Sequence, residues 1–133
     1  SESKLTYKVF KKNTLAFLNQ GISIFFSEVV PYGIFFDPTE RVYALRNKNL
    51  LPPYTMDDYT KDVALQRLIF QQLKEEFSDQ VNILKPSEWL CSSTFCNFDT
   101  GGYPNYFDMS HLTQVGVHRI RPMYEEIFIM KSN

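Results

Sequence analysis

The sequence predicts an α/β fold in which a mostly parallel sheet carries helices on both of its faces. Segments with the apolar spacing of amphipathic helices alternate along the chain with short, almost continuous apolar runs. Such runs are typical of strands buried on both faces of a parallel sheet. The 133 residues are 44% hydrophobic and 16% aromatic, which is enough for one domain with a real core. We therefore expect a single domain over residues 1–133.

The first helix is expected over residues 5–18. Its apolar side chains fall on one side of a helical wheel and its lysines on another. The apolar set is Leu5, Val9, Phe10, Ala16 and Phe17. The Asn-Gln-Gly sequence at 19–21 is a typical helix end, and the apolar run 22–30, closed by a proline, predicts a buried strand.

Residues 31–56 are rich in proline and predict a long excursion with no more than a short turn near 38–45. Thr55 followed by Asp58 resembles a helix-capping arrangement, so a second helix should begin there. We expect an apolar stripe with one polar member to face the core along this helix. The stripe is Tyr59, Val63, Gln66, Phe70, Leu73 and Phe77. Residues 81–84 then predict another short strand.

A polar stretch with two glycines leads from residue 87 towards the last helix. Thr113 is suited to cap that helix. Its expected apolar stripe is Val117, Ile120, Tyr124 and Ile127. Pro122 lies off the stripe and should kink the helix or begin a fresh first turn.

The charge pattern excludes some classes of partner. There are 14 basic and 15 acidic residues, and no basic block, so the chain has no electrostatic footprint for nucleic acid or an anionic membrane. Its apolar runs are far shorter than the ~18 residues of a membrane span. The chain begins without Met and without signal-peptide features, so we expect a piece of a longer protein or a processed product.

The two cysteines, Cys91 and Cys96, lie close together in the polar stretch. A local disulfide in an oxidising compartment is the favoured interpretation. Two free thiols are one alternative. The other is a metal site completed by His111 and His118, although this spacing matches no familiar zinc pattern.

Asp108 and His111 are the residues with the strongest chemical pattern. A hydroxyl nucleophile needs a base with a pKa near neutrality, which imidazole provides. A histidine used in this way needs an acceptor on its far nitrogen to fix the tautomer. Asp108, three residues earlier on one turn, can reach it. We therefore interpret His111 as a candidate general base and Asp108 as its orienting carboxylate.

The surroundings of this pair resemble a known family. The pattern Tyr106-x-Asp108-x-x-His111-Leu112-Thr113-x-x-Gly116, with Cys91-x4-Cys96 before it, is similar to the C-terminal signature of the SGNH domain of acyltransferase-3 membrane O-acyltransferases. The apolar run ending at Pro31 and the segment 81–91 are similar to earlier parts of that domain. The resemblance spans about residues 5–128, and the last forty or so carry the specific motifs.

The resemblance implies a doubly wound, flavodoxin-like sheet of the SGNH hydrolase (GDSL-like esterase) type, incomplete at its N-terminus. It implies Ser-His-Asp chemistry in which an acyl group, often acetyl, passes to a carbohydrate hydroxyl. A membrane domain of the parent protein would deliver the acyl donor, no cofactor is required, and the domain would lie outside the cytoplasm, tethered through the missing N-terminal part.

The chain departs from the family mainly by omission. None of its candidate serines lies in the Gly-Asp-Ser context of the family's nucleophile. These serines are Ser23, Ser27, Ser87, Ser92, Ser93 and Ser110. The family's oxyanion-hole residues are not recognisable either. The alternative is therefore a non-catalytic SGNH-like binding module or fragment, and we expect the chain alone to be inactive.

Other polar and aromatic residues have ordinary explanations beside functional ones. His118 and its arginine neighbours, Arg119 and Arg121, are expected to be solvated surface charges. Trp89 could line a sugar pocket, but a lone tryptophan more often packs or anchors. Tyr103 and Tyr106 carry the same ambiguity.

Overall fold

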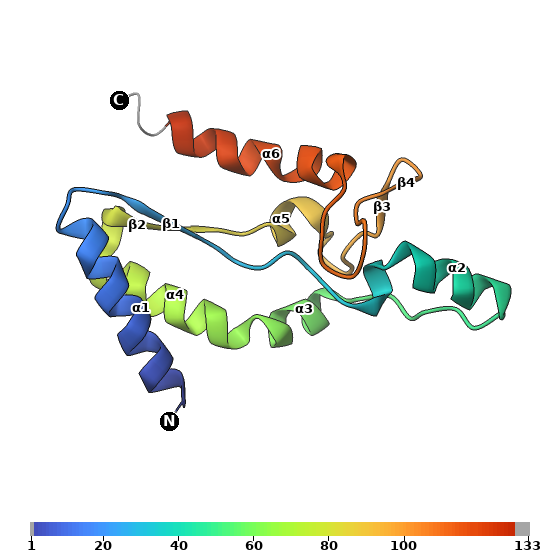
Figure 1. The fold of residues 1–133 in the computed structure, drawn as a ribbon, viewed down its shortest axis with the longest axis horizontal. Coiled ribbons are helices and arrows are strands. Elements are labelled where there is room, and N and C mark those ends of the chain that lie inside the picture. Colours follow the sequence, from blue (N-terminus) through green and yellow to red (C-terminus); the bar gives the residue numbers. More distant parts are fainter. Residues whose placement is uncertain (1, 130–133) are drawn as a thin grey trace. The chain divides into compact units, whose positions relative to one another are not determined.

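A computed structural model describes residues 2–129, with the side chains of residues 2 and 3 left undescribed (Figure 1). The chain divides into two compact units, which are described separately. The first unit comprises the chain up to Glu28 together with Lys61–Leu84, and the second comprises Val29–Thr60 together with the chain from Lys85 onward. No helix within residues 2–129 combines the length and apolar character that a bilayer span needs.

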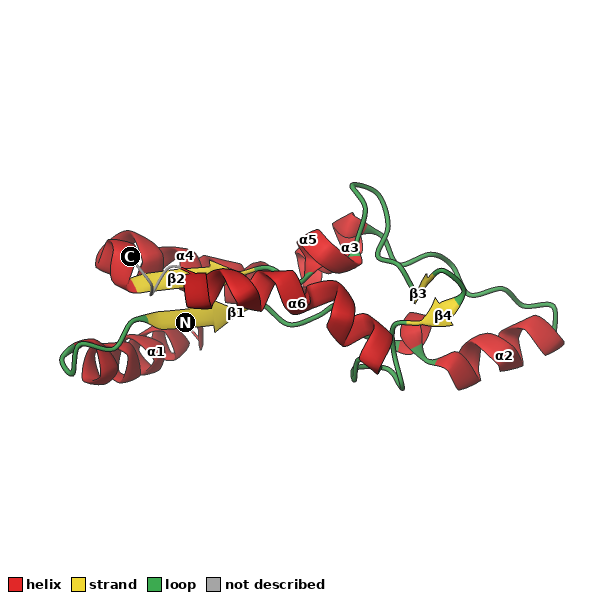
Figure 2. Ribbon diagram, turned by 90° about the horizontal axis from the view of Figure 1, so that it is seen from above, coloured by secondary structure: helices red, strands yellow, loops and turns green. Residues whose placement is uncertain are grey.

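The first unit contains two helices and two parallel strands. The helices are α1 (Glu2–Leu18) and α4 (Ala64–Phe77), and the strands are β1 (Ile24–Ser27) and β2 (Val81–Leu84), the latter preceded by the 3₁₀ turn η2 (Ser78–Gln80). β1 and β2 run side by side in the same direction, with Ile24 opposite Val81 and Ser27 opposite Leu84 (Figure 2). The strand at 81–84 matches the prediction, whereas the predicted strand 22–30 is confined to its centre.

One face of this strand pair carries the core of the first unit. Ile24, Phe26, Val81 and Ile83 alternate onto that face and pack with Leu18, Ile69, Phe70 and Leu73 from the two helices. The Phe26 and Phe70 rings stack with centroids 4.7 Å apart. Both helices of the unit therefore lie on one face of the strands. The predicted α/β layering is present, but two parallel strands are too few to show a doubly wound sheet or helices on both faces.

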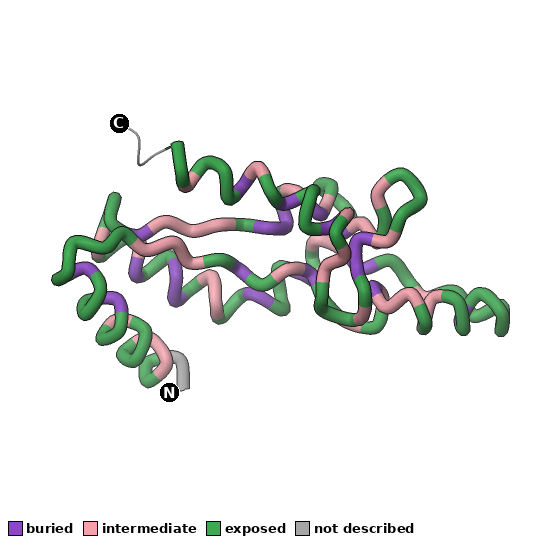
Figure 3. The backbone as a smooth tube through the Cα atoms, turned by 45° about the horizontal axis from the view of Figure 1, so that its top comes forward, coloured by how far each residue is buried: buried purple, intermediate pink, exposed green. Residues whose placement is uncertain are grey.

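Helix α1 buries a different side from the one expected. Most of α1 is exposed, with few buried positions (Figure 3). Thr14 and Leu18 are buried, whereas Leu5, Val9 and Phe17 of the predicted apolar side are each more than half exposed. Polar contacts to α4 determine this orientation: the Tyr7 hydroxyl donates to Glu76 at 2.5 Å, and Lys11 forms an ion pair with the same carboxylate. The predicted apolar side of α1 is thus wrong as the buried face, except at Phe10, whose ring lies 6.0 Å from those of both Phe26 and Phe70.

The second helix of the prediction is two helices. Thr55 and Asp58 form the expected cap, in which the Asp58 amide donates to the Thr55 hydroxyl and the Thr55 amide donates back to the Asp58 carboxylate. α3 (Met56–Asp62) ends at Asp62, and α4 begins after a single turn residue, Val63. The predicted stripe is nevertheless correct, because Tyr59, Val63 and Leu73 are almost fully buried.

The second unit is built largely from short elements. They are η1 (Ile34–Phe36), α2 (Pro38–Arg46), the start of α3, α5 (Ser87–Leu90), the two-residue strands β3 (Asp99–Thr100) and β4 (Tyr103–Pro104), and α6 (Gln114–Ile129). The expected turn near 38–45 is a helix because Asp37 caps it, accepting from the Thr39 amide at 2.8 Å. Phe36 links the aromatic core, with its ring 5.3 Å from Tyr54 and 4.4 Å from Tyr106.

Helix α6 starts where predicted, because the Thr113 hydroxyl accepts from the Gly116 amide at 3.2 Å. Its buried side is Gly116, Ile120 and Met123, so the predicted stripe is wrong at Val117 and Tyr124, which are exposed. The reason is the approach at Gly116: a Cβ placed there would stand 2.2 Å from the Asn105 carbonyl oxygen. This contact selects the inner side of α6. Pro122 lies within the helix and does not end it.

Substituting Gly116 by alanine should therefore destabilise the protein. Alanine would gain about 1 kcal/mol in helix propensity, but the new methyl group would collide with a backbone carbonyl rather than with a movable side chain. We expect a net loss of about 1–3 kcal/mol in the free energy of unfolding, as for other overpacked sites. Urea denaturation would measure it, with Val117→Ala on the exposed side of α6 as the control. An unchanged or raised stability of the Gly116→Ala variant would contradict the close approach.

Candidate active site

The Asp108–His111 turn is the tip of a loop between β4 and α6. Two contacts close its base: Tyr106 pairs with Leu112 in an isolated bridge, and the Phe107 amide donates to the His111 carbonyl at 2.7 Å. A third contact holds its side, where the Gly33 amide donates to the Met109 carbonyl at 2.7 Å. The candidate residues are therefore presented on a backbone that is fixed at both ends and in the middle.

The Asp108 carboxylate is fixed by backbone amides. One oxygen, Oδ1, accepts from the Ser110 amide at 2.8 Å and from the His111 amide at 2.9 Å. These bonds, followed by the one from the His111 ring, lower the pKa of Asp108 to about 2. Asp108 therefore stays a carboxylate throughout the pH range in which a histidine base works.

His111 lies against this carboxylate. Its Nδ1 is 2.8 Å from Asp108 Oδ2 and 3.0 Å from Oδ1. Since the ionised carboxylate only accepts hydrogen bonds, Nδ1 carries the proton, and in neutral imidazole Nε2 is then the basic nitrogen. The side chain is 78% exposed, and Nε2 has no partner among residues 2–129. The structure thus brings the two predicted residues together in the orientation that a general base requires.

Asn105 holds the chain segment that precedes the turn. Its side chain is fully buried, where Oδ1 accepts from the Thr100 hydroxyl at 2.8 Å and Nδ2 donates to the Asn97 carbonyl at 3.2 Å. Its backbone carbonyl accepts from the Thr113 amide at 2.9 Å and also lies against Gly116. Asn105 therefore connects the loop before the turn to the start of α6. In the sequence, Gly116 is the residue that hints at this role.

The aromatic and basic residues singled out in the sequence differ in burial and in their contacts. Tyr106 is fully buried against Phe36, and burial raises the pKa of its hydroxyl, so it is a core residue and not part of a sugar platform. Tyr103 is 69% exposed. His118 is exposed, as expected, whereas the Arg119 guanidinium donates to the Trp89 carbonyl at 2.9 Å and so joins α6 to α5.

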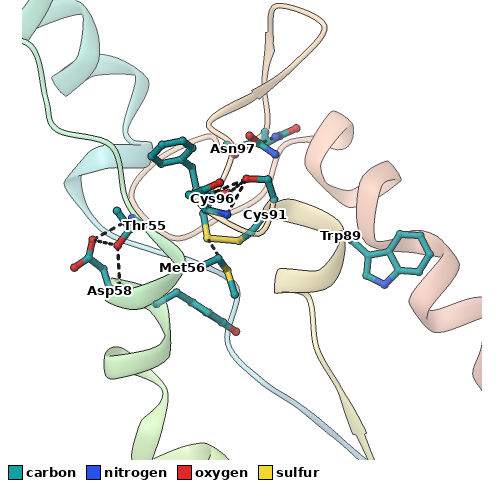
Figure 4. The surroundings of a disulfide bond; sticks show 12 residues. Thr55, Met56, Asp58, Trp89, Cys91, Cys96 and Asn97 are labelled. Carbon is teal, nitrogen blue, oxygen red and sulfur yellow. Dashed lines mark hydrogen bonds between the residues drawn. A yellow bond between two sulfur atoms is a disulfide. The ribbon is translucent and has the colours of Figure 1, made fainter.

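The two cysteines form a disulfide (Figure 4). It joins the two sides of a short loop in which the Ser92 amide donates to the Phe95 carbonyl at 2.7 Å. The loop is connected to the start of α3, because the Cys96 amide donates to the Tyr54 carbonyl and the Met56 amide to the Thr94 carbonyl, both at 2.9 Å. Trp89 points away from the disulfide in this view. The preferred interpretation of the cysteine pair is thus confirmed.

The disulfide also bears on the metal alternative. It occupies both thiols, which removes two of the four ligands that this alternative needed. Elsewhere in the described chain, no group of three or more His, Cys, Asp or Glu side chains is placed to hold a metal ion. The histidine at 111 is instead committed to Asp108.

Ser110 is the serine nearest to His111 and does not meet the base. Its hydroxyl is 3.5 Å from Nδ1, the nitrogen already bound to Asp108, and 3.5 Å from Asp108 Oδ1. A nucleophile activated by this histidine must contact Nε2 instead. No other serine of residues 2–129 contacts His111.

Another hollow of the described chain lies elsewhere, in the first unit. It has a volume of about 690 Å³ between α1 and α4, and is lined by lysines and glutamates. None of the predicted site residues lines it. We therefore do not treat it as the active site.

Comparison with known families decides the relationship. The family model of the SGNH domain that is fused to AT3 domains matches residues 2–126. The chain belongs to this SGNH family. The match covers both units and includes the Asp108–His111 turn, the disulfide and Gly116, and it connects the domain with acyltransferase-type proteins. No curated protein and no solved structure matches the chain.

Asp108 should titrate far below an ordinary aspartate. Its folded pKa of about 2 lies below the unfolded value of ~3.9, so the carboxylate stabilises the fold above about pH 4 and this contribution disappears as the pH falls towards 2. Carbon-detected NMR of the Asp108 carboxyl group would measure the pKa directly. Asp108→Asn should remove this part of the acid dependence. A midpoint near 4 would show that the amide contacts do not persist in solution.

Removing the disulfide should lower stability modestly. The closed loop is short, so the entropy model gives about 2 kcal/mol at 25 °C. We expect the Cys91→Ser/Cys96→Ser variant to unfold at a lower urea concentration by a corresponding amount. The matched control is the unmodified chain with and without reductant, and reductant should change only the unmodified chain.

Proposed function

We propose that this SGNH domain carries the acid-base half of an O-acyltransferase. This O-acyltransferase transfers an acyl group, such as acetyl, to a carbohydrate hydroxyl by Ser-His-Asp chemistry. The observation that supports this proposal most directly is the Asp108 carboxylate bound to His111 Nδ1 at 2.8 Å, with Nε2 left exposed.

The chemistry follows from this orientation. Nε2 of His111 takes the proton of a serine hydroxyl as the serine oxygen attacks the acyl carbonyl carbon, and then returns it to the leaving group. In the second half, Nε2 takes the proton of the sugar hydroxyl while that oxygen attacks the carbonyl carbon of the acyl-serine, and then returns the proton to the serine oxygen as the acyl–serine bond breaks. Asp108 remains ionised and stabilises the imidazolium in both halves, which its low pKa favours.

The nucleophile belongs, in this proposal, to a part of the parent protein outside residues 1–133. The support is twofold: no serine here has the family's Gly-Asp-Ser context, and Ser110 lies on the wrong nitrogen. A membrane domain of the AT3 type delivers the acyl donor to the same site.

An extracytoplasmic location fits the proposal. The Cys91–Cys96 disulfide is of a kind that persists in oxidising compartments and is rare in the cytosol. The balanced charge also offers nothing that would attract nucleic acid. We therefore propose that the domain lies in a periplasmic, luminal or extracellular space, beside the membrane.

A non-catalytic module is the competing proposal. The absence of a serine at Nε2 among residues 2–129 is the observation that favours it. It would keep the fold and bind a sugar or a partner without turnover. The two proposals differ in whether acyl transfer requires His111 as a base.

His111→Ala should abolish acyl transfer by the full-length protein encoded by the gene that carries this chain. We expect losses of about 10³- to 10⁴-fold in kcat for His111→Ala and Asp108→Asn, the second because asparagine no longer stabilises the imidazolium or imposes the tautomer. Release and transfer of acetyl from a chromogenic acetyl ester would measure the rate. The residues 1–133 expressed alone should show none.

His118→Ala provides the matched control, since His118 is an exposed histidine on α6 with no contact to the turn. It should retain full activity. Full activity of the His111→Ala protein would support the non-catalytic module. Robust turnover by the isolated chain would reveal a nucleophile within it.

A further inference from the structure

A hollow in the second unit has the composition of a sugar-binding pocket. Its volume is about 270 Å³, just below the ~300–1,000 Å³ of sites for drug-sized ligands. It therefore has room for one ring unit. Its lining combines aromatic rings with a few polar side chains, chiefly Phe35, Phe98, Arg41, Asn97 and Asp99.

The aromatic walls of this pocket are held in place by other rings. Phe35 lies 5.5 Å from Tyr54, measured between ring centroids, and Phe36 lies 5.3 Å from the same ring. Cys96, fixed by the disulfide, forms another part of the wall. Rigid aromatic and apolar surface of this kind can cover the C–H face of a sugar ring without losing side-chain entropy.

Arg41 is oriented but largely unpaired. Its guanidinium lies over the Phe98 ring at 4.1 Å, and Nη1 donates to the Phe35 carbonyl at 3.3 Å. The guanidinium has no other hydrogen-bond or ion-pair partner among residues 2–129. The remaining N–H groups of a half-buried, stacked guanidinium are therefore available to a ligand.

The polar groups match hydroxyls better than anions. Arg41 donates, the Asp99 carboxylate accepts, and the Asn97 amide does both. The positive and negative charges in the lining balance, so a carboxylate or phosphate ligand would gain from Arg41 and be repelled by Asp99. Sugar hydroxyls, which donate and accept at the same time, satisfy the whole set.

The pocket shares its supports with the Asp108–His111 turn. The η1 segment has Gly33 before it, bonded to Met109 of the turn, and ends at Phe36, which lines the pocket and packs on Tyr106. On the other side, the Asn97 carbonyl accepts from Asn105. The same short elements therefore position both features.

We propose that this pocket binds one uncharged sugar unit of the acceptor glycan, with Arg41 and Asn97 as its hydrogen-bonding residues. This inference rests on the proposed acyl transfer to a carbohydrate and adds the place where the sugar is held. Neither residue takes part in the proton transfers of His111.

Titration of the ¹⁵N-labelled chain with methyl glycosides of glucose, galactose, rhamnose and N-acetylglucosamine tests the proposal. We expect at least one to bind with a Kd on the order of 1 mM, as for a single small ligand. The amide and side-chain signals of Arg41, Asn97 and Phe98 should shift. Arg41→Ala and Asn97→Ala should each weaken binding by about tenfold.

Arg46→Ala is the matched control, because Arg46 ends the same helix and does not line the pocket. Thermal unfolding of each variant separates a lost contact from a lost fold, and Asn97→Ala leaves intact the Asn97 carbonyl that supports Asn105. Absence of shifts with every neutral glycoside would overturn the proposal. Binding of methyl glucuronide alone, abolished by Arg41→Ala, would overturn it in favour of an anion site.

The His111→Ala chain separates this proposal from the acyl-transfer proposal. It should bind the sugar as well as the unmodified chain does. Sugar binding together with full activity of the His111→Ala full-length protein would refute the role of His111 as the base in acyl transfer, and the pocket proposal would still stand. Loss of activity in that protein with no sugar binding by the chain would refute the pocket alone.

Discussion

The close approach of α6 to the Asn105 carbonyl is the constraint on which the candidate site depends. That oxygen accepts from the Thr113 amide and lies 2.2 Å from the position that a Cβ of residue 116 would occupy. The first turn of α6 is therefore seated directly on the strand-like segment that precedes Asp108. With both ends of the loop fixed, its tip has few conformations left, and Asp108 and His111 are held within that tip.

A site can be preorganised in this way without being buried. His111 is mostly exposed, so no low-dielectric environment strengthens its bond to Asp108. The orientation comes instead from two backbone amides that hold Asp108 Oδ1. Because the amides belong to the loop itself, the carboxylate keeps its place whether or not the imidazole is charged. A base that is protonated and deprotonated in each cycle benefits from such a fixed partner.

Helix caps and the Asp108–His111 pair could be predicted from the sequence, whereas the side that each terminal helix buries could not. The Thr55–Asp58 and Thr113 caps and the Asp108–His111 pair involve residues near each other in the chain, and the strand at 81–84 is a short apolar run bounded by polar residues. The buried sides of α1 and α6 were predicted wrongly in part, because contacts with residues outside each helix, Glu76 for α1 and Asn105 for α6, favour another side. Periodicity shows that a helix has an apolar side, but a polar contact with another element, or a close approach at a glycine, can cause a different side to be buried.

The spacing of the turn has a physical explanation in the same contacts. An aspartate whose oxygen accepts from the amides two and three residues later forms a tight local turn. The residue that supplies the second amide must then lie over the carboxylate, so a histidine at that position meets it with Nδ1. A histidine one residue earlier or later would lose this register. The Asp-x-x-His spacing therefore orients the base. The Thr-x-x-Gly spacing that follows fixes the end of the loop that carries this base.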